Sequence, residues 1–319
     1  MLQLMLHSHP RIAIPPETRF VVTAYERRRD FGDLEDPAKR RALAEWIVGR
    51  RETKFHDLGL DPELVTEAIV TGPPTLGAAL GAVFQAYARR FGKPRWGDKR
   101  PTYIQHLDGL LRLFPDAQVV HLIRDGRDCV ASLKEMSWYK RDAFHATATW
   151  TQAIDLGRRA AARLGPDSYY QLQYEHLVDN PAGELRRLCA FLGEDYDSQM
   201  TQPQRIAGSA VPPQKRWHQR TKAAVNSSRV GSWNARLEPW EIALAETVMG
   251  RRLQDHGYEL TGAPRPPAAH LATFARVTAD RKLVASKRAV RDRWDRRREP
   301  NPVALVQVGD LVGEPLLRR

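Results

Sequence analysis

The chain has 319 residues, of which 42% are hydrophobic and 28% are charged. This much apolar material can build a sizeable core, in one large domain or two smaller ones, and it excludes a disordered chain. The 50 basic and 38 acidic residues leave a net charge of +12. An excess of this size favours a polyanionic ligand, a nucleic acid or an anionic membrane surface as partner. Residues 265–319 hold 13 of the basic and 6 of the acidic residues, so most of the net positive charge lies in this tail. The body of the chain is only mildly basic, and we therefore expect no nucleic acid to bind it.

Cys129 and Cys189 are the two cysteines of the sequence, and each falls on the apolar face of an expected helix. Such cysteines act as small hydrophobic residues, and two unpaired thiols fit a reducing compartment. No apolar run reaches the roughly 18 residues that span a bilayer. The opening Met1–Leu6 is short and lacks the basic start of a signal peptide. The sequence therefore predicts a cytoplasmic protein.

The first part of the chain predicts one extended segment and three helices. We expect His7-Ser8-His9-Pro10 to end the apolar turn Met1–Leu6, and Arg11–Ile14 to be extended because Pro15-Pro16 follows it. Capping residues or apolar periodicity predict the three helices, which start at Asp36-Pro37, at Asp61-Pro62 and at Thr75. The first helix is expected to end near Gly49 and the last near Phe91.

Strands and helices then alternate. Trp96 belongs to a short strand that ends in the charged turn Asp98-Lys99-Arg100, and a helix follows from Tyr103 to Phe114. The next strands are Val119–Ile123 and Tyr169–Gln173, separated by a long helix from Asp142 to Leu164. This alternation predicts an α/β fold with a parallel sheet and right-handed crossovers, in which ligands bind at the carboxyl ends of the strands. Lys99, Arg124 and Tyr174 all follow such ends.

The stretch Ala117–Lys134 predicts an anion site. An apolar run ends at Arg124-Asp125-Gly126, and a helix begins near Asp128, which we expect to be its N-cap. Ser132 lies eight positions after Arg124, or about two helical turns, so both side chains can face one crevice. The alternative is an ordinary surface turn with solvated charges, and the spacing alone does not decide between the two.

The last third of the sequence predicts helices, loops and a basic tail. Helices start at Asn180-Pro181 and at Pro239, Ser198–Val225 is a long polar loop, and Ser227–Trp233 is a compact segment suited either to wrapping a small anion or to an ordinary turn. The prolines at 264–267 indicate a linker. A basic amphipathic helix from Ala268 to about Arg298 and an apolar tail follow. We therefore expect one domain at 1–262 and an accessory segment at 263–319.

Five segments in this order resemble the sulfotransferases that use 3′-phosphoadenosine-5′-phosphosulfate (PAPS), particularly their bacterial and protein-tyrosine branches. The segments are HSHPRIAIPPETR, GDKRPTY, FPDAQVVHLIRDGRDCVASL, YEHLVDNPAGELRRLCAFLG and SSRVGSW. The resemblance covers roughly residues 1–260. It implies a bacterial enzyme of the transferase class with a P-loop NTPase-like three-layer sandwich around a parallel central sheet.

The resemblance also implies which residues bind the nucleotide. In this family the arginine after the strand and the serine eight residues later hold the 3′-phosphate, which makes Arg124 and Ser132 their counterparts. The tyrosine of the Tyr-Glu-x-Leu segment contacts the adenine, and it corresponds to Tyr174. Arg229, with Ser227 or Ser228, closes over the nucleotide phosphates.

Two residues are implied to act in catalysis. Glu17, which beside Arg19 would otherwise be an ordinary surface ion pair, corresponds to the general base of the protein-tyrosine branch. Lys99 corresponds to the lysine beside the transferred group. Sulfuryl transfer depends mostly on positioning and electrostatics, as phosphoryl transfer does, and lysine, arginine and amide donors can supply these without a metal ion. We therefore expect PAPS as the donor substrate and no metal.

One part of the family pattern is absent from the sequence. The glycine-rich phosphate loop of the family precedes a helix that continues as Leu-x-x-Met-Leu-x-x-His-Pro, and Met1 lies inside that helix. We expect that the natural protein extends upstream. If the chain truly begins at Met1, we expect weak or no transfer, because the loop amides that orient the sulfate are then missing.

The sequence leaves the acceptor open among small molecules, glycans and lipids. Two other interpretations stay open beside the enzyme: an inactive remnant that binds 3′,5′-adenosine bisphosphate, and a protein that contacts a membrane surface through its C-terminal helix. A homo-oligomer is a further open alternative.

Overall fold

The computed structural model describes residues 1–206, 226–299 and 303. The chain divides into two compact units, each built from separate stretches of sequence. Unit 1 comprises Met1–Gln118, Leu185–Val225 and Asp292–Arg319, and unit 2 comprises Val119–Glu184 and Asn226–Arg291. The domain boundary that we expect between residues 262 and 263 stays a prediction.

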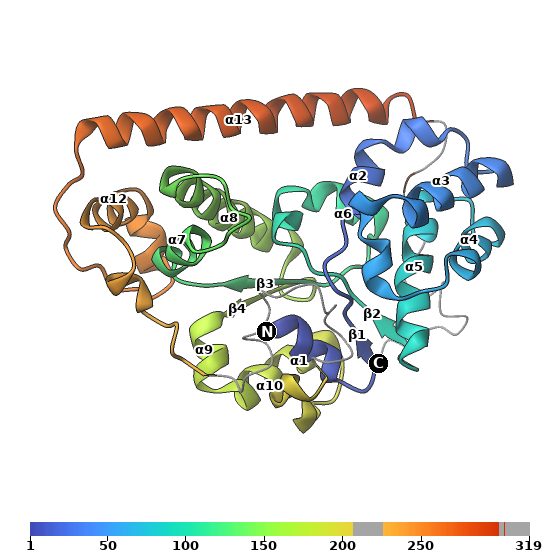
Figure 1. Ribbon diagram of the computed structural model, residues 1–319, viewed down its shortest axis with the longest axis horizontal. Coiled ribbons are helices and arrows are strands. Elements are labelled where there is room, and N and C mark those ends of the chain that lie inside the picture. The colour runs from blue at the N-terminus through green and yellow to red at the C-terminus, as the bar shows by residue number, and fades with distance from the viewer. Residues whose placement is uncertain (207–225, 300–302, 304–319) are drawn as a thin grey trace. The chain divides into compact units, whose positions relative to one another are not determined.

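Unit 1 is mostly helical, and Figure 1 labels its elements. Its α-helices are α1 (Leu2–Ser8), α2 (Phe20–Glu26), α3 (Pro37–Gly49), α4 (Pro62–Thr71), α5 (Leu76–Arg90), α6 (Leu107–Leu113) and most of α10 (Pro181–Leu192). Its short 3₁₀ helices are η1 (Arg28–Phe31), η2 (Arg51–Thr53), η3 (Phe55–Leu58), η4 (Pro101–Gln105), η5 (Ser198–Thr201) and η6 (Pro203–Arg205). Its strands are β1 (Ile12–Ala13) and β2 (Arg95–Trp96).

The helix starts predicted from capping residues are confirmed. The Asp36 carboxylate accepts the amide of Ala38 at 2.8 Å, and Asp61 accepts that of Glu63 at 2.8 Å. Thr75 Oγ1 accepts the amide of Ala78 at 3.1 Å. These side chains satisfy amides that have no partner inside the helix, so each helix begins where its cap stands.

The opening helix α1 ends at Ser8, within the predicted stretch His7–Pro10. His7 and Ser8 stay within α1 because their side chains serve the backbone: His7 Nδ1 accepts the amide of Ile14 at 3.1 Å, and Ser8 Oγ donates to the carbonyl of Leu4 at 2.9 Å. Burial, with a smaller effect from Lys93, lowers the pKa of His7 from 6.5 to about 4. His7 is therefore a neutral acceptor in the folded protein at physiological pH.

The core of unit 1 includes a line of aromatic rings. Phe20 stacks on Phe84 with ring centroids 5.3 Å apart, and Phe84 stacks on Trp96 at 4.9 Å. Trp96 also meets Phe114 edge to face. This line packs α2 and α5 against the end of β2, and offset aromatic pairs of this kind each contribute roughly 0.5–1.5 kcal/mol beyond the area they bury.

Unit 2 alternates strands and helices. Its elements are β3 (Val119–Ile123), α7 (Gly126–Lys134), α8 (Ala143–Leu164), β4 (Tyr169–Gln173), α9 (Tyr174–Asp179), η8 (Ser232–Ala235), α12 (Pro239–Asp255) and most of α13 (Ala268–Arg296). Figure 1 shows β3 and β4 side by side, with α7, α8 and α12 grouped on one side of them. Ile123, Val130, Trp150 and Met249 belong to the core that these elements enclose.

Both pairs of strands are parallel, which confirms the α/β expectation. β1 pairs with β2, and β3 pairs with β4 in the register that aligns Val119 with Tyr169 and Ile123 with Gln173. The described strands form these two separate pairs, one in each unit, where the sequence predicts one central sheet. In a parallel pair both carboxyl ends lie at the same edge, so the residues that follow the two strands become neighbours.

The predicted start of the helix after β3 is wrong by three residues. Asp125, and not Asp128, is the N-cap of α7, because its side chain accepts the amide of Arg127 at 2.8 Å. Gly126 is then the first helical residue, and a Cβ added there would lie 2.6 Å from Met249 Sδ and 2.8 Å from the Trp150 ring. Only glycine leaves room for this close packing. Asp128 is thereby placed in the first turn with its carboxylate available for other partners.

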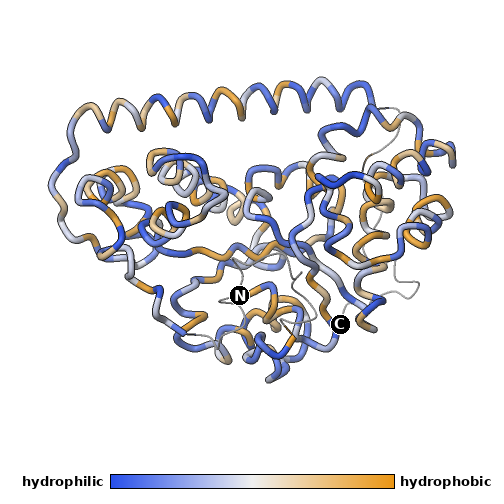
Figure 2. Tube along the Cα trace, in the orientation of Figure 1, coloured by the Kyte–Doolittle hydropathy of each residue, from blue (hydrophilic) through white to orange (hydrophobic). Residues whose placement is uncertain are grey.

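Both cysteines are free thiols, and burial raises the pKa of Cys129 to about 12. Within the described residues, the long helix α13 confirms the expected basic helix. Figure 2 shows α13 as a mostly hydrophilic helix with single hydrophobic positions. Residues 207–225 of the predicted polar loop and 304–319 of the apolar tail lie outside the described residues.

Candidate functional site

The predicted nucleotide-binding residues of unit 2 gather at the carboxyl ends of β3 and β4. Arg124 follows Ile123, Tyr174 follows Gln173, and these two strand residues are paired in the parallel register. The register therefore places Arg124 beside Tyr174, and the guanidinium carbon lies 4.6 Å from the centroid of the tyrosine ring. A cation over an aromatic face is attracted by the ring quadrupole, which orients Arg124 toward the strand ends.

Helix α7 adds the serine that the sequence predicts. Arg124 Nη1 lies 3.4 Å from Ser132 Oγ. The Trp150 indole on α8 donates to the carbonyl of Arg124 at 2.9 Å, which fixes the backbone at the strand end. The structure thus brings Arg124, Ser132 and Tyr174 together, as the sequence predicts.

Asp128 joins this cluster to the loop that precedes η8. Its carboxylate is fully buried and accepts the amides of Gly231 at 2.9 Å and Trp233 at 2.8 Å. It also accepts the hydroxyl of Ser232 at 3.1 Å and lies 3.3 Å from Arg124 Nη2. A buried carboxylate with this many donors is well compensated, so it holds the loop close to Arg124.

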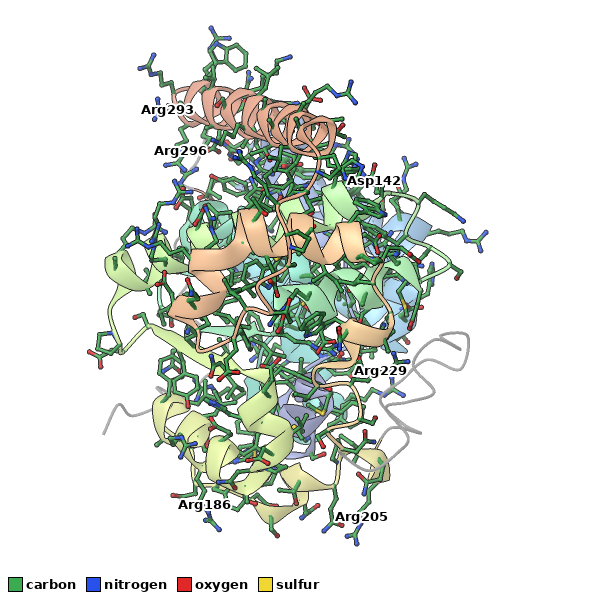
Figure 3. The ribbon with its side chains drawn as sticks, turned by 90° about the vertical axis from the view of Figure 1, so that its left-hand side faces the viewer. Asp142, Arg186, Arg205, Arg229, Arg293 and Arg296 are labelled. Atoms are coloured by element: carbon green, nitrogen blue, oxygen red, sulfur yellow. The ribbon has the colours of Figure 1, made fainter. Side chains whose placement is uncertain are left out.

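The loop 226–231 contributes backbone rather than side-chain contacts to Arg124. The carbonyl of Arg229 accepts from Arg124 Nη2, whereas Arg229 Nη1 lies 3.4 Å from Glu135. Figure 3 labels Arg229 on this loop. Ser228 donates its amide to the Asn226 side chain at 3.2 Å, and both Ser227 and Ser228 are exposed. The structure therefore does not place the Ser227, Ser228 and Arg229 side chains on Arg124, and their predicted role stays a prediction.

Arg236 is a residue of this cluster that the sequence argument missed. Its Nη1 donates to Ser232 Oγ at 2.8 Å and its Nε to Glu135 at 2.7 Å. Arg236 Nη2 and Arg124 Nε are buried and have no hydrogen-bond partner among the described residues. Buried donors without partners are costly. An anion bound at the strand ends would give such donors acceptors.

Of the residues that sequence reasoning missed, one is indicated by a local pattern in the sequence and two are not. Asp128 stands four positions after Arg124, which is the spacing of an ion pair on a helix, and this signal was available. Arg236 and Trp150 reach the cluster from distant parts of the sequence, so no local pattern indicates them.

The two predicted catalytic residues lie in unit 1. As in unit 2, each follows the carboxyl end of one strand of a parallel pair, which places them close together. Glu17 comes four residues after β1, and Lys99 three residues after β2. Lys99 Nζ lies 3.4 Å from Glu17 Oε2, and Arg100 Nε lies 4.0 Å from Glu17 Oε1. The Glu17 side chain is 31% exposed, so its carboxylate is open to solvent. Glu17 and Lys99 are thus brought together.

A buried network supports the backbone beside this pair. Thr18 Oγ1 donates to Asp98 Oδ2 at 2.9 Å, and the Tyr103 hydroxyl donates to the same oxygen. Burial raises the pKa of Asp98, with opposing effects from these two hydrogen bonds. Thr18 is adjacent to Glu17 and Asp98 to Lys99, so one carboxylate oxygen joins the two segments that hold the predicted catalytic residues.

The two clusters of predicted residues differ in chemical character. Unit 2 presents cationic donors and an aromatic ring at a strand edge, which suits a phosphate attached to a base. Unit 1 presents a carboxylate beside two cations, which suits proton removal next to an anionic group. Among the described residues, no three His, Cys, Asp or Glu side chains cluster as a metal site does, and no helix is long and apolar enough to cross a membrane.

These features define an α/β protein with cationic and aromatic side chains after the carboxyl ends of parallel strands. Comparison identifies the family. The model of the sulfotransferase family matches residues 1–198, which is more than half of the chain. The chain therefore belongs to the sulfotransferase family.

Curated relatives include protein-tyrosine sulfotransferases and a dihydromenaquinone sulfotransferase. Protein-tyrosine sulfotransferase A of Caenorhabditis elegans is 23% identical over 66% of this chain and 51% of its own length. The Drosophila melanogaster protein-tyrosine sulfotransferase is 21% identical over 90% of this chain and 55% of its own. Omega-hydroxy-beta-dihydromenaquinone-9 sulfotransferase Stf3 of Mycobacterium bovis is 29% identical over 30% of this chain and 28% of its own. The chain spans about half the length of the first two of these relatives.

Two solved structures share the fold. The sulfotransferase domain from the curacin biosynthetic pathway gives a TM-score of 0.53 at 20% identity, over 81% of this chain and 93% of that domain. The sulfotransferase domain from the Synechococcus PCC 7002 olefin synthase gives a TM-score of 0.50 at 24% identity, over 77% of this chain and 88% of that domain. The expected P-loop NTPase-like fold class is confirmed by these likenesses.

Proposed function

We propose that the chain transfers a sulfuryl group from PAPS to a hydroxyl or amine acceptor. The observation that supports this most is the cluster in unit 2, where Arg124 lies within 3.4 Å of Ser132 Oγ and over the ring of Tyr174. A guanidinium with a hydroxyl suits a terminal phosphate, and an aromatic ring suits stacking on a purine. PAPS offers both groups in one molecule, with its 3′-phosphate on Arg124 and Ser132 and its adenine on Tyr174.

The proposed reaction needs one base and one cation near the transferred group. The Glu17 carboxylate takes the proton of the acceptor hydroxyl while the acceptor oxygen forms a bond to sulfur. The bond between sulfur and the bridging phosphate oxygen breaks, and adenosine 3′,5′-bisphosphate leaves. Lys99, whose ammonium lies 3.4 Å from Glu17, offsets the negative charge that develops on the bridging oxygen.

The acceptor class is proposed from the relatives. The matched proteins are named for protein tyrosine and for a hydroxylated menaquinone, which are a phenol and a lipid alcohol. We therefore place phenolic and lipid hydroxyls first among the acceptors to test, followed by glycans and other small molecules.

The test uses purified full-length chain with sulfur-labelled PAPS and a panel of phenolic, lipid-alcohol and glycan acceptors. Binding of adenosine 3′,5′-bisphosphate is measured on the same preparation by calorimetry. We expect the chain to bind adenosine 3′,5′-bisphosphate. Arg124→Gln should weaken this binding at least about tenfold, because a charged contact to phosphate is lost. We also expect labelled product with at least one acceptor class. Arg158→Gln, an exposed arginine on α8 of the same unit, is the matched control.

The outcomes separate the alternatives. Binding without transfer to any acceptor would identify an inactive nucleotide-binding remnant. Absence of bisphosphate binding, or binding that is equal in Arg124→Gln, would contradict the proposed site itself.

A further inference from the structure

Helix α13 presents hydrophobic side chains to solvent along one stripe. Leu283, Val290 and Trp294 are 54%, 64% and 45% exposed, and Val284 beside them is 63% exposed. Spacings of seven and four residues align the first three on one face of the helix. Lys287 lies between them on the same face. Exposed large hydrophobic residues are common singly, but an aligned group on one helix indicates an interaction surface.

The opposite face of α13 packs against the protein. Val277 and Asp295 are 7% and 5% exposed. Arg281 Nη2 donates to Gln152 at 2.6 Å in unit 2, and Asp292 and Asp295 pair with Arg28 and Arg29 in unit 1. Within unit 2 the helix therefore has a seated face and an outward face, and Leu283 and Val290 lie on the outward one. The Trp294 ring is partly exposed and also lies 4.6 Å from the guanidinium carbon of Arg29.

The charges of α13 favour an anionic partner. The helix holds eight Lys or Arg residues and three Asp residues. Two of the three acidic residues, Asp292 and Asp295, are already neutralised by ion pairs on the seated side. Arg276, Lys282 and Lys287 are exposed near the stripe, and Figure 3 labels Arg293 near the end of the helix. Arg296, also labelled there, pairs with Asp292 at 2.7 Å. The outward face is thus hydrophobic along its centre and basic along its flanks.

We propose that the outward face of α13 docks on an anionic lipid bilayer, with the helix lying parallel to the surface. A helix of 29 residues with hydrophobic and aromatic side chains on one line and many basic residues beside it has the character of an interfacial helix. Lys287 within the stripe can extend its ammonium to the phosphate level while its alkyl chain lies among lipid carbons. Trp294 suits the same boundary, since its ring has both an apolar body and a polar edge. This proposal does not depend on the proposed transferase activity.

Vesicle sedimentation with the full chain tests the docking surface. The vesicles are phosphatidylcholine alone, or equal parts of phosphatidylcholine and phosphatidylserine. We expect binding to the anionic vesicles that weakens as salt rises, and little binding to the neutral ones. The double variant Leu283→Asn with Val290→Asn and the double variant Lys282→Glu with Lys287→Glu should each lower the partition coefficient at least about tenfold.

Matched controls lie elsewhere on the surface. Leu64→Asn removes a leucine that is 72% exposed on α4, and Lys140→Glu with Arg158→Glu reverses two exposed charges of unit 2. These changes should leave vesicle binding within about twofold, because they lie off the proposed surface. Circular dichroism of each variant checks that the fold is intact.

Three outcomes would overturn the proposal. One is absence of binding to anionic vesicles at low salt. Another is binding that is insensitive to the Leu283 and Val290 changes, which would indicate general attraction of a basic protein. The third is a dimer that these same changes dissociate in the absence of lipid, since the stripe would then be an interface between copies of the chain.

Discussion

The buried carboxylate of Asp128 accepts the backbone amide of Trp233 at 2.8 Å, and so connects the first turn of α7 with the loop that ends at η8. The same carboxylate lies 3.3 Å from Arg124. We expect Asp128→Asn to weaken adenosine 3′,5′-bisphosphate binding about tenfold and to lower the free energy of unfolding by about 1–3 kcal/mol, because the new amide turns a donor toward neighbouring donors. Calorimetry and urea unfolding measure the two effects. Asp142→Asn, at the exposed N-cap of α8, is the control, and equal losses in both variants would contradict the special position of Asp128.

Arg236 is expected to contribute to phosphate binding because its Nη2 is buried without a partner among the described residues. Arg236→Gln should lower the affinity for adenosine 3′,5′-bisphosphate about tenfold, as a charge-assisted contact is lost, and should leave the affinity for adenosine unchanged. Competition binding with both ligands measures this. Arg252→Gln, which removes an arginine paired with Asp155 in the same unit, is the control. Equal weakening for adenosine would indicate a general disturbance of the loop.

Glu17→Gln should abolish most of the transfer and leave nucleotide binding intact. An amide has the size of the carboxylate but cannot take the acceptor's proton, so kcat should fall at least about 100-fold. The measurement pairs initial transfer rates with bisphosphate calorimetry. Glu45→Gln, an exposed glutamate on α3, should change neither. Full activity of Glu17→Gln would assign the base to another group.

Asp98 should make the protein less stable as the pH rises. Because burial raises the pKa of Asp98, the folded state holds its proton more tightly than the unfolded chain does. The free energy of unfolding therefore falls as the pH rises through the folded-state pKa. Asp98→Asn should remove this dependence, and urea unfolding along a pH series should show it. A variant with the unchanged pH dependence would show that Asp98 stays ionised in the folded protein.

His7 should have the opposite effect on stability. Its pKa is about 4 in the folded protein against 6.5 when unperturbed. The unfolded chain binds a proton below pH 6.5 that the folded chain does not, so stability is fully present above that pH and decreases toward pH 4. At pH 5 the loss amounts to roughly 2 kcal/mol. His7→Asn preserves an acceptor for the amide of Ile14 and should reduce the loss between pH 7 and pH 5 in urea unfolding, whereas the surface change His145→Asn should not.

Local chemistry made much of this fold predictable. Asp36 and Asp61 cap helices as their spacing with proline indicates, and the apolar run ending at Ile123 is a parallel strand. The sequence does not fix the cap of α7, because Asp125 and Asp128 both offer a carboxylate near the helix start and sequence alone does not show which one meets the free amides. Tertiary partners decide this: Asp128 is occupied by Gly231, Ser232 and Trp233 from a segment about a hundred residues away.

The candidate site shows the same division between local and distant information. Arg124 and Tyr174 were predictable because the carboxyl ends of parallel strands lie together. Arg236 was not, since its position depends on how the loop before η8 folds onto α7. The Arg229 side chain lies beside Glu135 while its carbonyl accepts from Arg124, and its contact with the nucleotide phosphates stays a prediction.

The hydrogen bond from the Trp150 indole to the carbonyl of Arg124 has an optical consequence. The chain has eight tryptophans. The ring centroid of a second one, Trp233, lies 4.1 Å from the guanidinium carbon of Arg127 in the first turn of α7. Two indoles thus stand within the electric field of the cationic cluster, and the emission of an indole shifts when nearby charge changes. A negatively charged nucleotide at Arg124 would alter that field, so the intrinsic fluorescence of the unmodified protein can report its binding without any attached dye.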